Sequence, residues 1–332
     1  MILITGHFGF VGQHLASKLN GLGIEWCGID NKGFGVTNGD IRNEYDLECA
    51  FELNQVTQVV HLAALAGVRR SKLYPAEYIS TNVLGTQNVV NMCKKYGARM
   101  INFSSSSVYG NLKELPAVED SPKNPTSLYG ITKLAAEQIV KNAFLGIEAL
   151  TLRPFTIYGE NGRKDEVIYK WLEQIKANKP ITIYGNPEES CRGYVYVGDL
   201  VNVVAQLLQK ENWDYGVNDF NIGGSEVIYL NDILNLFLEQ FKGKVSTHQL
   251  ERPKEDVVNQ YADISRAKKL LGYVPKPRFI ENVKKILKEE VKKRAGHRCI
   301  DPRDNITEIY VEPTLVVKFK SSFTIKNKIK EL

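Results

Sequence analysis

The stretch Ile2–Leu19, ILITGHFGFVGQHLASKL, places Gly6, Gly9 and Gly12 between a short β-branched run and an amphipathic helical pattern. Glycines at a strand-to-helix turn permit a tight bend, a close approach of the backbone to a pyrophosphate, and close contact of helix and strand. Glycine-rich turns also form for structural reasons alone, so the spacing G-x-x-G-x-x-G by itself carries little weight. Its position after a strand and before a helix favours a dinucleotide site.

The next strand of the sequence supports this interpretation. It ends in Asp30, eighteen residues after Gly12. A carboxylate at this place can accept hydrogen bonds from both adenosine ribose hydroxyls and would repel a 2′-phosphate, which predicts NAD rather than NADP. The alternative is that Asp30 is a turn residue only. The segments Gly39–Ile41 and His61–Ala64 are expected to flank the same cofactor.

Short apolar runs alternate with helical patterns through the first half of the chain. Strands are predicted near residues 1–5, 24–30, 57–63, 99–105 and 148–155, and helices near 9–21, 44–52, 75–95 and 127–145. This alternation is typical of an α/β protein of the Rossmann type, a doubly wound parallel sheet covered on both faces.

The pattern changes after about residue 155, where shorter strands such as 219–223 are mixed with helices. We expect an NAD-binding domain over 1–155, to which later segments return, a smaller α/β substrate-binding domain over 156–295, and a strand-forming extension over 296–332. Within the extension, Val317–Lys326 alternates apolar with polar residues.

Composition excludes several classes of protein. The 332 residues carry a formal net charge of +5, and the densest basic run, Lys284–Arg294, is interrupted by acidic and apolar residues, which favours a solvated helix face over a nucleic-acid site. No apolar run reaches the roughly 18 residues of a membrane span, so we expect neither a membrane partner nor a signal peptide. The cysteines form an odd set without metal-ligand spacing, which predicts no disulfide framework, no metal site and a reducing, cytoplasmic location. They are Cys27, Cys49, Cys93, Cys191 and Cys299.

A second constellation follows the fourth predicted strand. Phe103–Gly110, FSSSSVYG, puts four hydroxyls at the end of a buried strand, where a hydroxyl without a partner costs about 1–3 kcal/mol. The serines therefore either form a turn or serve a ligand. Tyr129 and Lys133 are four positions apart, on one face of a predicted helix. The Lys133 ammonium can stabilise a phenolate on Tyr129, a base that removes a proton from an alcohol while a nicotinamide accepts the hydride.

Three segments resemble, in their order along the chain, the motifs of the extended short-chain dehydrogenase/reductases, the NAD-dependent sugar-nucleotide epimerase and dehydratase family. They are TGHFGFVG, SSSSVYG and YGITK. The likeness covers about residues 1–293. It implies a catalytic triad of Ser105, Tyr129 and Lys133, and a homodimer formed through the helices at 75–95 and 127–145.

The resemblance also assigns Asn82 to the nicotinamide region, although an asparagine at a helix start is equally explained by capping. The predicted cofactor residues are Gly6, Phe8, Gly9, Phe10, Val11, Gly12, Asp30, Asn31, Asp40, Ile41, Leu62, Ala63, Ala64, Asn82, Ser104, Tyr129 and Lys133.

Members of this family oxidise C4 of a nucleotide-bound sugar and differ in the step that follows. Dehydratase-like members carry Asp-Glu after the catalytic hydroxyl, whereas this chain has Ser106 and Ser107, which cannot serve as acid and base near neutral pH. We therefore expect a nucleotide-sugar 4-epimerase, an isomerase of EC class 5.1.3, acting through a transient 4-keto sugar. A decarboxylase, dehydratase or reductase with the same triad is the alternative. The complete triad disfavours a binding protein that has lost the chemistry.

The segments expected to bind the substrate resemble those of UDP-glucuronate 4-epimerases more than those of UDP-glucose 4-epimerases. This resemblance implies that the substrate is a UDP-hexuronate or a UDP-hexose. By this resemblance Arg163 addresses a sugar carboxylate through paired hydrogen bonds, and Arg192 and Arg252 hold the diphosphate. A solvated surface arginine is the alternative at each position. The predicted substrate residues are Arg69, Ser105, Ser106, Ser107, Thr156, Arg163, Arg192 and Arg252. Such enzymes typically supply polysaccharide biosynthesis.

Overall fold

β1 (Ile2–Thr5) lies inside a six-stranded sheet of order β2-β1-β3-β4-β5-β9, and every neighbouring pair of strands is parallel. The chain runs from β1 outward to β2 and then returns to β3 on the other side, so the strand order reverses between β1 and β3. In open parallel sheets, ligands bind at the carboxyl ends of the strands at such a reversal. The other strands are β2 (Trp26–Ile29), β3 (Gln58–His61), β4 (Arg99–Phe103), β5 (Ala149–Pro154) and β9 (Asp219–Ile222).

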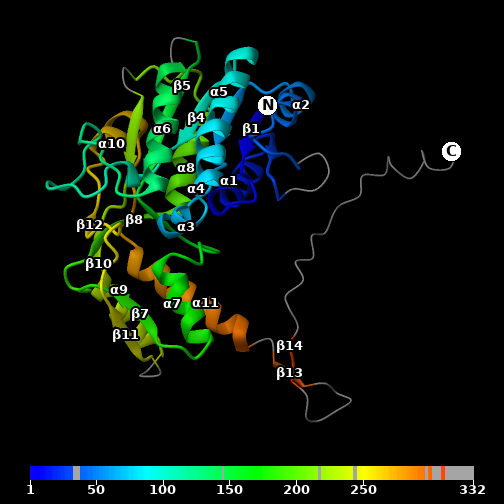
Figure 1. The fold of residues 1–332 in the computed structure, drawn as a ribbon. Helices are drawn as coiled ribbons and strands as arrows, with labels where there is room; N and C mark the ends of the chain where they lie inside the picture. The colour runs from blue at the N-terminus through cyan, green and yellow to red at the C-terminus, as the bar shows by residue number, and fades with distance from the viewer. Residues whose placement is uncertain are drawn as a thin grey trace. The chain divides into compact units, whose positions relative to one another are not determined.

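Helices cover both faces of this sheet (Figure 1), and the predicted doubly wound fold is confirmed. Alternate side chains of each strand enter opposite cores because successive residues of a strand point to opposite faces. Ile2 and Ile4 pack in the core that includes α1 (Phe10–Gly21) and α8 (Val197–Leu208). Leu3 packs in the other core, with α2 (Glu44–Asn54), α5 (Gly85–Tyr96) and α6 (Leu128–Ala143).

The single helix predicted over 75–95 is divided into three parts. α4 (Pro75–Ile79) is followed by a π-helical turn, η2 (Ser80–Leu84), and then by α5. π-Helical turns are rare and frequently occur at functional sites. Asn82 lies inside η2, so it is not a helix-capping residue, and the capping interpretation is wrong.

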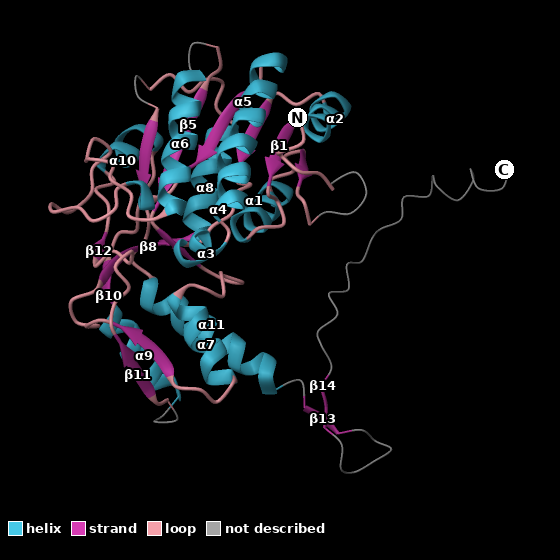
Figure 2. Ribbon diagram, viewed as in Figure 1, coloured by secondary structure: helices cyan, strands magenta, loops and turns pink. Residues whose placement is uncertain are grey.

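The computed structural model describes residues 1–32, 38–143, 146–215, 218–241, 245–295, 298–300 and 308–310. Residues Met1–Ile286 form one unit, and a second begins at Leu287. Figure 2 distinguishes the helices of the chain, in cyan, from its strands, in magenta. The elements not yet named follow. They are α3 (Val68–Leu73), η3 (Ser106–Val108), β6 (Thr156–Tyr158), α7 (Val167–Lys176), β7 (Ile181–Tyr184), β8 (Cys191–Tyr196), β10 (Val227–Tyr229), α9 (Leu230–Phe241), β11 (Thr247–Leu250), β12 (Asn259–Gln260), α10 (Ser265–Leu271), α11 (Phe279–Ala295), β13 (Arg298–Ile300) and β14 (Glu308–Tyr310).

The second half of the chain adds smaller sheets to the first unit. β8 pairs with β6, β10 and β12, and β7 pairs with β11. β9 instead joins the main sheet beside β5. The domain boundaries at 155 and 295 stay predictions. In the second unit β13 pairs antiparallel with β14, and the alternating stretch Val317–Lys326 lies outside the described residues.

Candidate active site

The glycine turn joins β1 to α1 where the strand order reverses. Gly6 has a φ of +73°, which disfavours any side chain, and a Cβ there would lie 2.8 Å from the Ala63 backbone. A Cβ at Gly12 would lie 2.5 Å from the Gly6 carbonyl oxygen. The turn is therefore a backbone cradle, and Gly9 is the N-cap of α1. Backbone N–H groups at a helix N-terminus suit a pyrophosphate, so these residues fit a dinucleotide.

Asp30 follows β2 and is tied to the glycine turn. Its carboxylate accepts hydrogen bonds from the backbone N–H of Phe8 at 3.0 Å and of Lys32 at 2.9 Å. The hydrogen bond from Lys32 stabilises the turn after β2, as expected of a turn residue. The hydrogen bond from Phe8 holds the Asp30 carboxylate beside the glycine turn. A carboxylate has about four acceptor positions, so about two remain for ribose hydroxyls. Asn31, next in the chain, is exposed.

The other predicted cofactor residues around the turn have three kinds of surroundings. Leu62 and Ala63 lie at the carboxyl end of β3, where the Ala63 N–H donates to the Thr5 hydroxyl at 3.1 Å. Ile41 is 4% exposed and belongs to the core beside Gly85. Residues that are half-buried or exposed at this edge are Phe8, Phe10, Val11, Asp40 and Ala64.

Asn82 connects the loop after β3 to the helix that carries the predicted base. Its carboxamide oxygen accepts from the Leu65 N–H at 2.8 Å, and its nitrogen donates to the Leu65 carbonyl and to the Thr132 hydroxyl, both at 3.0 Å. Thr132 in turn donates to the Tyr129 carbonyl at 2.9 Å. Both N–H bonds of Asn82 are thus used inside the protein, and its contribution is to hold α6 against the β3 edge.

The four serines after β4 have four different surroundings. The Ser105 hydroxyl donates to that of Ser107 at 3.2 Å, and it lies near the Tyr129 phenol, whose pKa it lowers. Ser106 donates to the Gln260 carboxamide at 3.1 Å, and Gln260 donates back to the Ser106 carbonyl at 3.0 Å. The hydroxyl of Ser104 is buried and has no partner in the described part of the chain. A buried hydroxyl in that state suits a ligand atom.

Tyr129 and Lys133 lie one turn apart on α6, as predicted. Burial raises the pKa of the Tyr129 phenol, while the Arg163 guanidinium and the Ser105 hydroxyl act in the opposite direction. Burial also lowers the pKa of Lys133 to about 8, and the Glu137 carboxylate partly offsets that effect. Burial thus disfavours the charged form of both groups, so a Tyr129 phenolate depends on the neighbouring Arg163 guanidinium and Ser105 hydroxyl.

Arg163 comes from the loop after β6 and faces this catalytic pair. A Cβ at Gly67 would lie 3.4 Å from its Nη2 atom, so the loop after β3 and the loop after β6 meet here. Arg163 forms an ion pair with Asp165, and its side chain remains 32% exposed. Arg69 lies further out, in an ion pair with Asp256 at 2.9 Å and over the Tyr184 ring at 4.2 Å.

Arg192 and Arg252 have no carboxylate within ion-pair distance in the described residues. Arg192 donates instead to the carbonyl oxygens of Cys191, Val258 and Val257 at 2.9, 2.6 and 2.5 Å, and Arg252 donates to the Ser190 hydroxyl. Burial lowers the pKa of Arg192, and the neighbouring charge of Arg252 lowers it further. Two close guanidiniums of this kind favour a bound anion.

Sequence reasoning missed Glu166 and Gln260. Glu166 precedes α7, and its carboxylate acts on the charges of Arg163, Arg192 and Tyr129, so it lies among the predicted substrate residues. Its place directly after Arg163-Lys-Asp was a signal that it shares their loop. Gln260 gives no such signal, because β12 is far from the serines in sequence. Thr156, which was predicted, is half-buried in β6 and pairs with Tyr194 of β8.

A family model described as the NAD dependent epimerase/dehydratase family matches residues 2–223. The chain belongs to this family. The predictions of the family and of NAD as its cofactor are thereby confirmed. The match spans the glycine turn, the serine segment and the Tyr129–Lys133 pair.

Relatives within the epimerase/dehydratase family carry more specific names. UDP-glucuronate 4-epimerase 4 of Arabidopsis thaliana is 30% identical, over 86% of this chain and 74% of the relative. The UDP-glucuronate 4-epimerase of Thermodesulfobacterium geofontis is 31% identical, over 85% of this chain and 94% of the relative. The structure of MoeE5 in complex with UDP-glucuronic acid and NAD matches with a TM-score of 0.79 and 29% identity, covering 88% of this chain and 99% of that one. Within the described residues, no helix has the length and hydropathy needed to cross a bilayer.

Proposed function

We propose that this chain is an NAD-dependent UDP-sugar 4-epimerase. The observation that carries the proposal is the meeting of the Ser105 hydroxyl with the Tyr129 phenol, with Lys133 buried one turn along α6, at the sheet edge that holds the glycine turn. These groups can hold a sugar hydroxyl, remove its proton and return it. When bound, NAD supplies the chemistry that they lack, because it takes a hydride from C4 of the sugar and gives it back.

The protein's own residues prepare the two binding sites. Gly6, Gly9 and Gly12 offer backbone to the pyrophosphate, and Asp30 has acceptor positions for the adenosine ribose. We assign the partnerless Ser104 hydroxyl to the cofactor side of the serine turn.

Tyr129 is the proposed base. It receives the proton of the C4 hydroxyl of the sugar, and Ser105, whose hydroxyl lies beside the Tyr129 phenol, holds that sugar hydroxyl in place. The positive charge of Arg163 stabilises the phenolate that must form, since burial alone keeps the phenol protonated. Lys133, one turn along α6, is the second proposed source of positive charge. The 4-keto sugar then turns its opposite face toward the nicotinamide site, and return of the proton to the C4 oxygen completes the epimerisation.

Arg192 and Arg252 are the proposed diphosphate ligands. Both are held by neutral oxygens, and the charge of Arg252 lies close enough to lower the pKa of Arg192. A diphosphate between them removes that repulsion and accepts paired hydrogen bonds from each guanidinium.

The reaction is tested by its product. Incubation with UDP-glucuronate or UDP-glucose, followed by proton NMR, is expected to show the C4 epimer without loss of carbon dioxide or water. A pentose or an accumulating 4-keto sugar would instead identify a decarboxylase or a dehydratase. Elimination is disfavoured here because Ser106 is engaged by Gln260 and neither it nor Ser107 is an acid or base near neutral pH.

Two sugars are candidates, and the charges around Arg163 distinguish them. The resemblance to UDP-glucuronate 4-epimerases and the position of Arg163 beside Tyr129 favour a hexuronate. A neutral hexose is the second candidate, because Asp165 already pairs with Arg163 and the Glu166 carboxylate lies nearby. The ratio of kcat/KM for UDP-glucuronate and UDP-glucose decides between them.

We further propose a homodimer built on the face formed by α4, η2 and α6, which contact one another. Ile79, Leu84 and Ile131 are each 51% exposed on these elements. Apolar side chains gathered on one surface favour burial against a second copy. Light scattering should show that Leu84→Lys yields monomers, whereas Leu53→Lys, at a 79% exposed residue on α2, leaves the dimer intact.

We also propose a cytoplasmic location and a role in supplying polysaccharide biosynthesis. Four cysteines, Cys27, Cys49, Cys93 and Cys191, are free thiols, which suits a reducing compartment. Fractionation of the source cells tests the location.

A further inference from the structure

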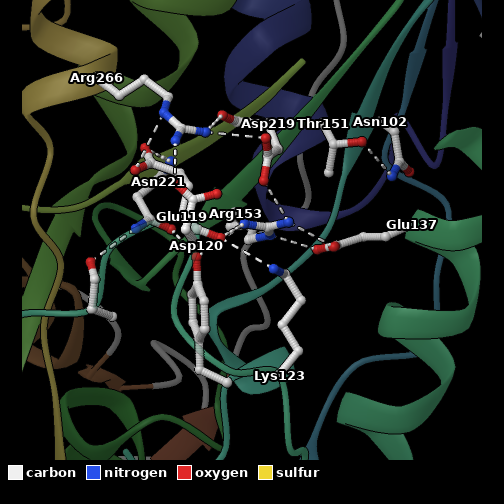
Figure 3. Close-up of polar contacts among 12 residues, drawn as sticks. Asn102, Glu119, Asp120, Lys123, Glu137, Thr151, Arg153, Asp219, Asn221 and Arg266 are labelled. Carbon is white, nitrogen blue, oxygen red and sulfur yellow. Dashed lines mark hydrogen bonds and ion pairs between the residues drawn. The ribbon is translucent and has the colours of Figure 1, made fainter. Parts of the chain in front are cut away.

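Arg153 lies at the centre of a buried polar cluster (Figure 3), and its side chain is only 4% exposed. Nε and Nη2 donate to the Glu137 carboxylate at 2.9 and 3.0 Å, and Nη2 also pairs with Asp219 at 2.8 Å. Nη1 donates to the Tyr109 hydroxyl and the Glu119 carbonyl, both at 3.0 Å. The five N–H bonds of the guanidinium therefore face five acceptor atoms.

One side of the cluster reaches the helix of the catalytic base. Glu137 lies on α6 one turn after Lys133, and it is buried. Both of its carboxylate oxygens are held by Arg153, a bidentate arrangement that fixes direction as well as distance. The rotation and the height of α6 relative to β5 are thus set by this ion pair.

Another side of the cluster reaches the serine turn. Ser105 is the N-cap of η3 and Tyr109 is its C-cap, so the two residues delimit one short helical turn. The Tyr109 hydroxyl donates to Asn221 at 2.7 Å while it accepts from Arg153. The Arg153 guanidinium therefore holds η3 as well, and with η3 it holds Ser105.

We propose that Arg153 is a positioning residue of the active site, which sets the separation of Ser105 from Tyr129 by holding α6 and η3 at once. The proposal rests on the proposed function, in which Ser105 and Tyr129 act on one sugar hydroxyl. Arg153 itself touches neither residue.

Stability alone is a poor explanation for this cluster. Burying ionised groups carries a large desolvation penalty, and buried ion pairs replaced by apolar side chains are often neutral or stabilising. What an apolar replacement cannot supply is a planar group that reaches two separate elements with fixed geometry. Lysine, with three N–H bonds, can satisfy at most three of the five acceptors.

The test compares Arg153→Lys with Arg266→Lys. Arg266 lies at the outer end of the cluster, beyond Asp219 in Figure 3, where it pairs with Asp120 and Asp219 at 2.8 and 3.2 Å. It contacts neither α6 nor η3 through any interaction described among these residues. We expect Arg153→Lys to lower kcat on the order of 100-fold, because displacement of reacting groups by about 1 Å has that effect.

The KM for the UDP-sugar should change by less than about threefold in Arg153→Lys, since the proposed diphosphate ligands Arg192 and Arg252 make no described hydrogen bond or ion pair with Arg153. Amide hydrogen exchange should accelerate in both segments 105–109 and 129–137. Arg266→Lys should leave kcat and these exchange rates unchanged. Glu137→Gln is a second variant for the case that Arg153→Lys does not fold. It keeps the shape of the side chain, weakens the hold on α6, and should accelerate exchange in 129–137 together with a fall in kcat.

The proposal is overturned if Arg153→Lys, or Glu137→Gln in its place, keeps wild-type kcat and exchange. It is equally overturned if Arg266→Lys loses as much kcat as Arg153→Lys at a temperature where both are folded. If the wild-type protein epimerises no UDP-sugar, the proposed function fails instead, and the exchange pattern of the two segments still decides whether Arg153 holds both.

Discussion

Gly12→Ala is expected to damage the NAD site through a single methyl group. Gly12 lies in the first turn of α1, and its Cβ would be 2.5 Å from the Gly6 carbonyl oxygen and 2.6 Å from the Cα of His7. Both neighbours are backbone atoms of the glycine turn, so no side chain can rotate away. Gly21, the last residue of the same helix, has no atom within 4 Å of its added Cβ and supplies the matched control.

The size of the effect follows from these distances. Ordinary contact begins near 3.4 Å, so the turn must open by about 0.9 Å, the difference between 3.4 and 2.5 Å. Overpacking of this kind costs roughly 1–3 kcal/mol. If the strain falls on the NAD-binding conformation, the dissociation constant for NAD rises by about 5- to 150-fold. The intrinsic preference of helices for alanine, up to about 1 kcal/mol, offsets part of this loss in Gly12→Ala and stabilises Gly21→Ala.

The measurement is calorimetric titration of NAD into protein from which the cofactor has been removed. Thermal melting with and without NAD gives an independent measure of the affinity for NAD. A ligand that binds only the folded state stabilises it by an amount that grows with the logarithm of the ratio of ligand concentration to dissociation constant, and Tm rises accordingly. Gly21→Ala should bind like the wild type, and Gly12→Ala should show a weaker affinity and a smaller Tm shift. Equal affinities for NAD in all three proteins would refute the close approach of backbone to cofactor at Gly12.

Three further predictions concern the chemistry. Tyr129→Phe should lower kcat by roughly 10³-fold or more while NAD remains bound in the titration, because the proton acceptor is lost and the cradle is not. Arg192→Met and Arg252→Met should each weaken UDP binding by roughly 10- to 150-fold in calorimetry, the loss expected for a charged hydrogen-bond donor, and unchanged affinities would remove them from the diphosphate site. Lys133→Met should raise the Tm of the NAD-free protein at pH 7 while it abolishes turnover. Burial lowers the pKa of Lys133 from 10.5 to about 8, so below pH 8 its charge destabilises the fold by on the order of 1–3 kcal/mol. Between pH 8 and 10.5 the unfolded chain binds more protons than the folded one, the wild type gains stability, and the advantage of Lys133→Met should shrink.

The main sheet and the cofactor edge were predictable because their signals are local. Both faces of β1 are apolar, because Ile2 and Ile4 lie on one face and Leu3 on the other. A strand needs apolar residues on both faces only when both faces are buried. The glycine turn and Asp30 lie within one strand-helix-strand unit, so their contact follows from the chain's own path. Tyr129 and Lys133 share a helix, and their spacing alone places them on one face.

The remaining parts of the site depend on contacts between distant segments. The π-helical turn at Asn82 arises where its side chain must reach Leu65, a requirement that no helical pattern in residues 75–95 reveals. Arg153 lies near the carboxyl end of β5, and its side chain points into a cluster drawn from α6, β9 and the segment after η3. Such a cluster has no sequence period, so only the fold shows which acceptors one guanidinium gathers.

Burial explains why the catalytic pair needs partners beyond itself. It raises the pKa of Tyr129 and lowers that of Lys133, so it opposes both of the charges on which base catalysis depends. The pair on α6 cannot overcome this by spacing alone. Glu137 favours the charged form of Lys133, and Arg163 favours the phenolate of Tyr129. Because Arg163 is also the proposed partner of a sugar carboxylate, we expect the ionisation of Tyr129 to depend on the charge that the substrate brings to Arg163.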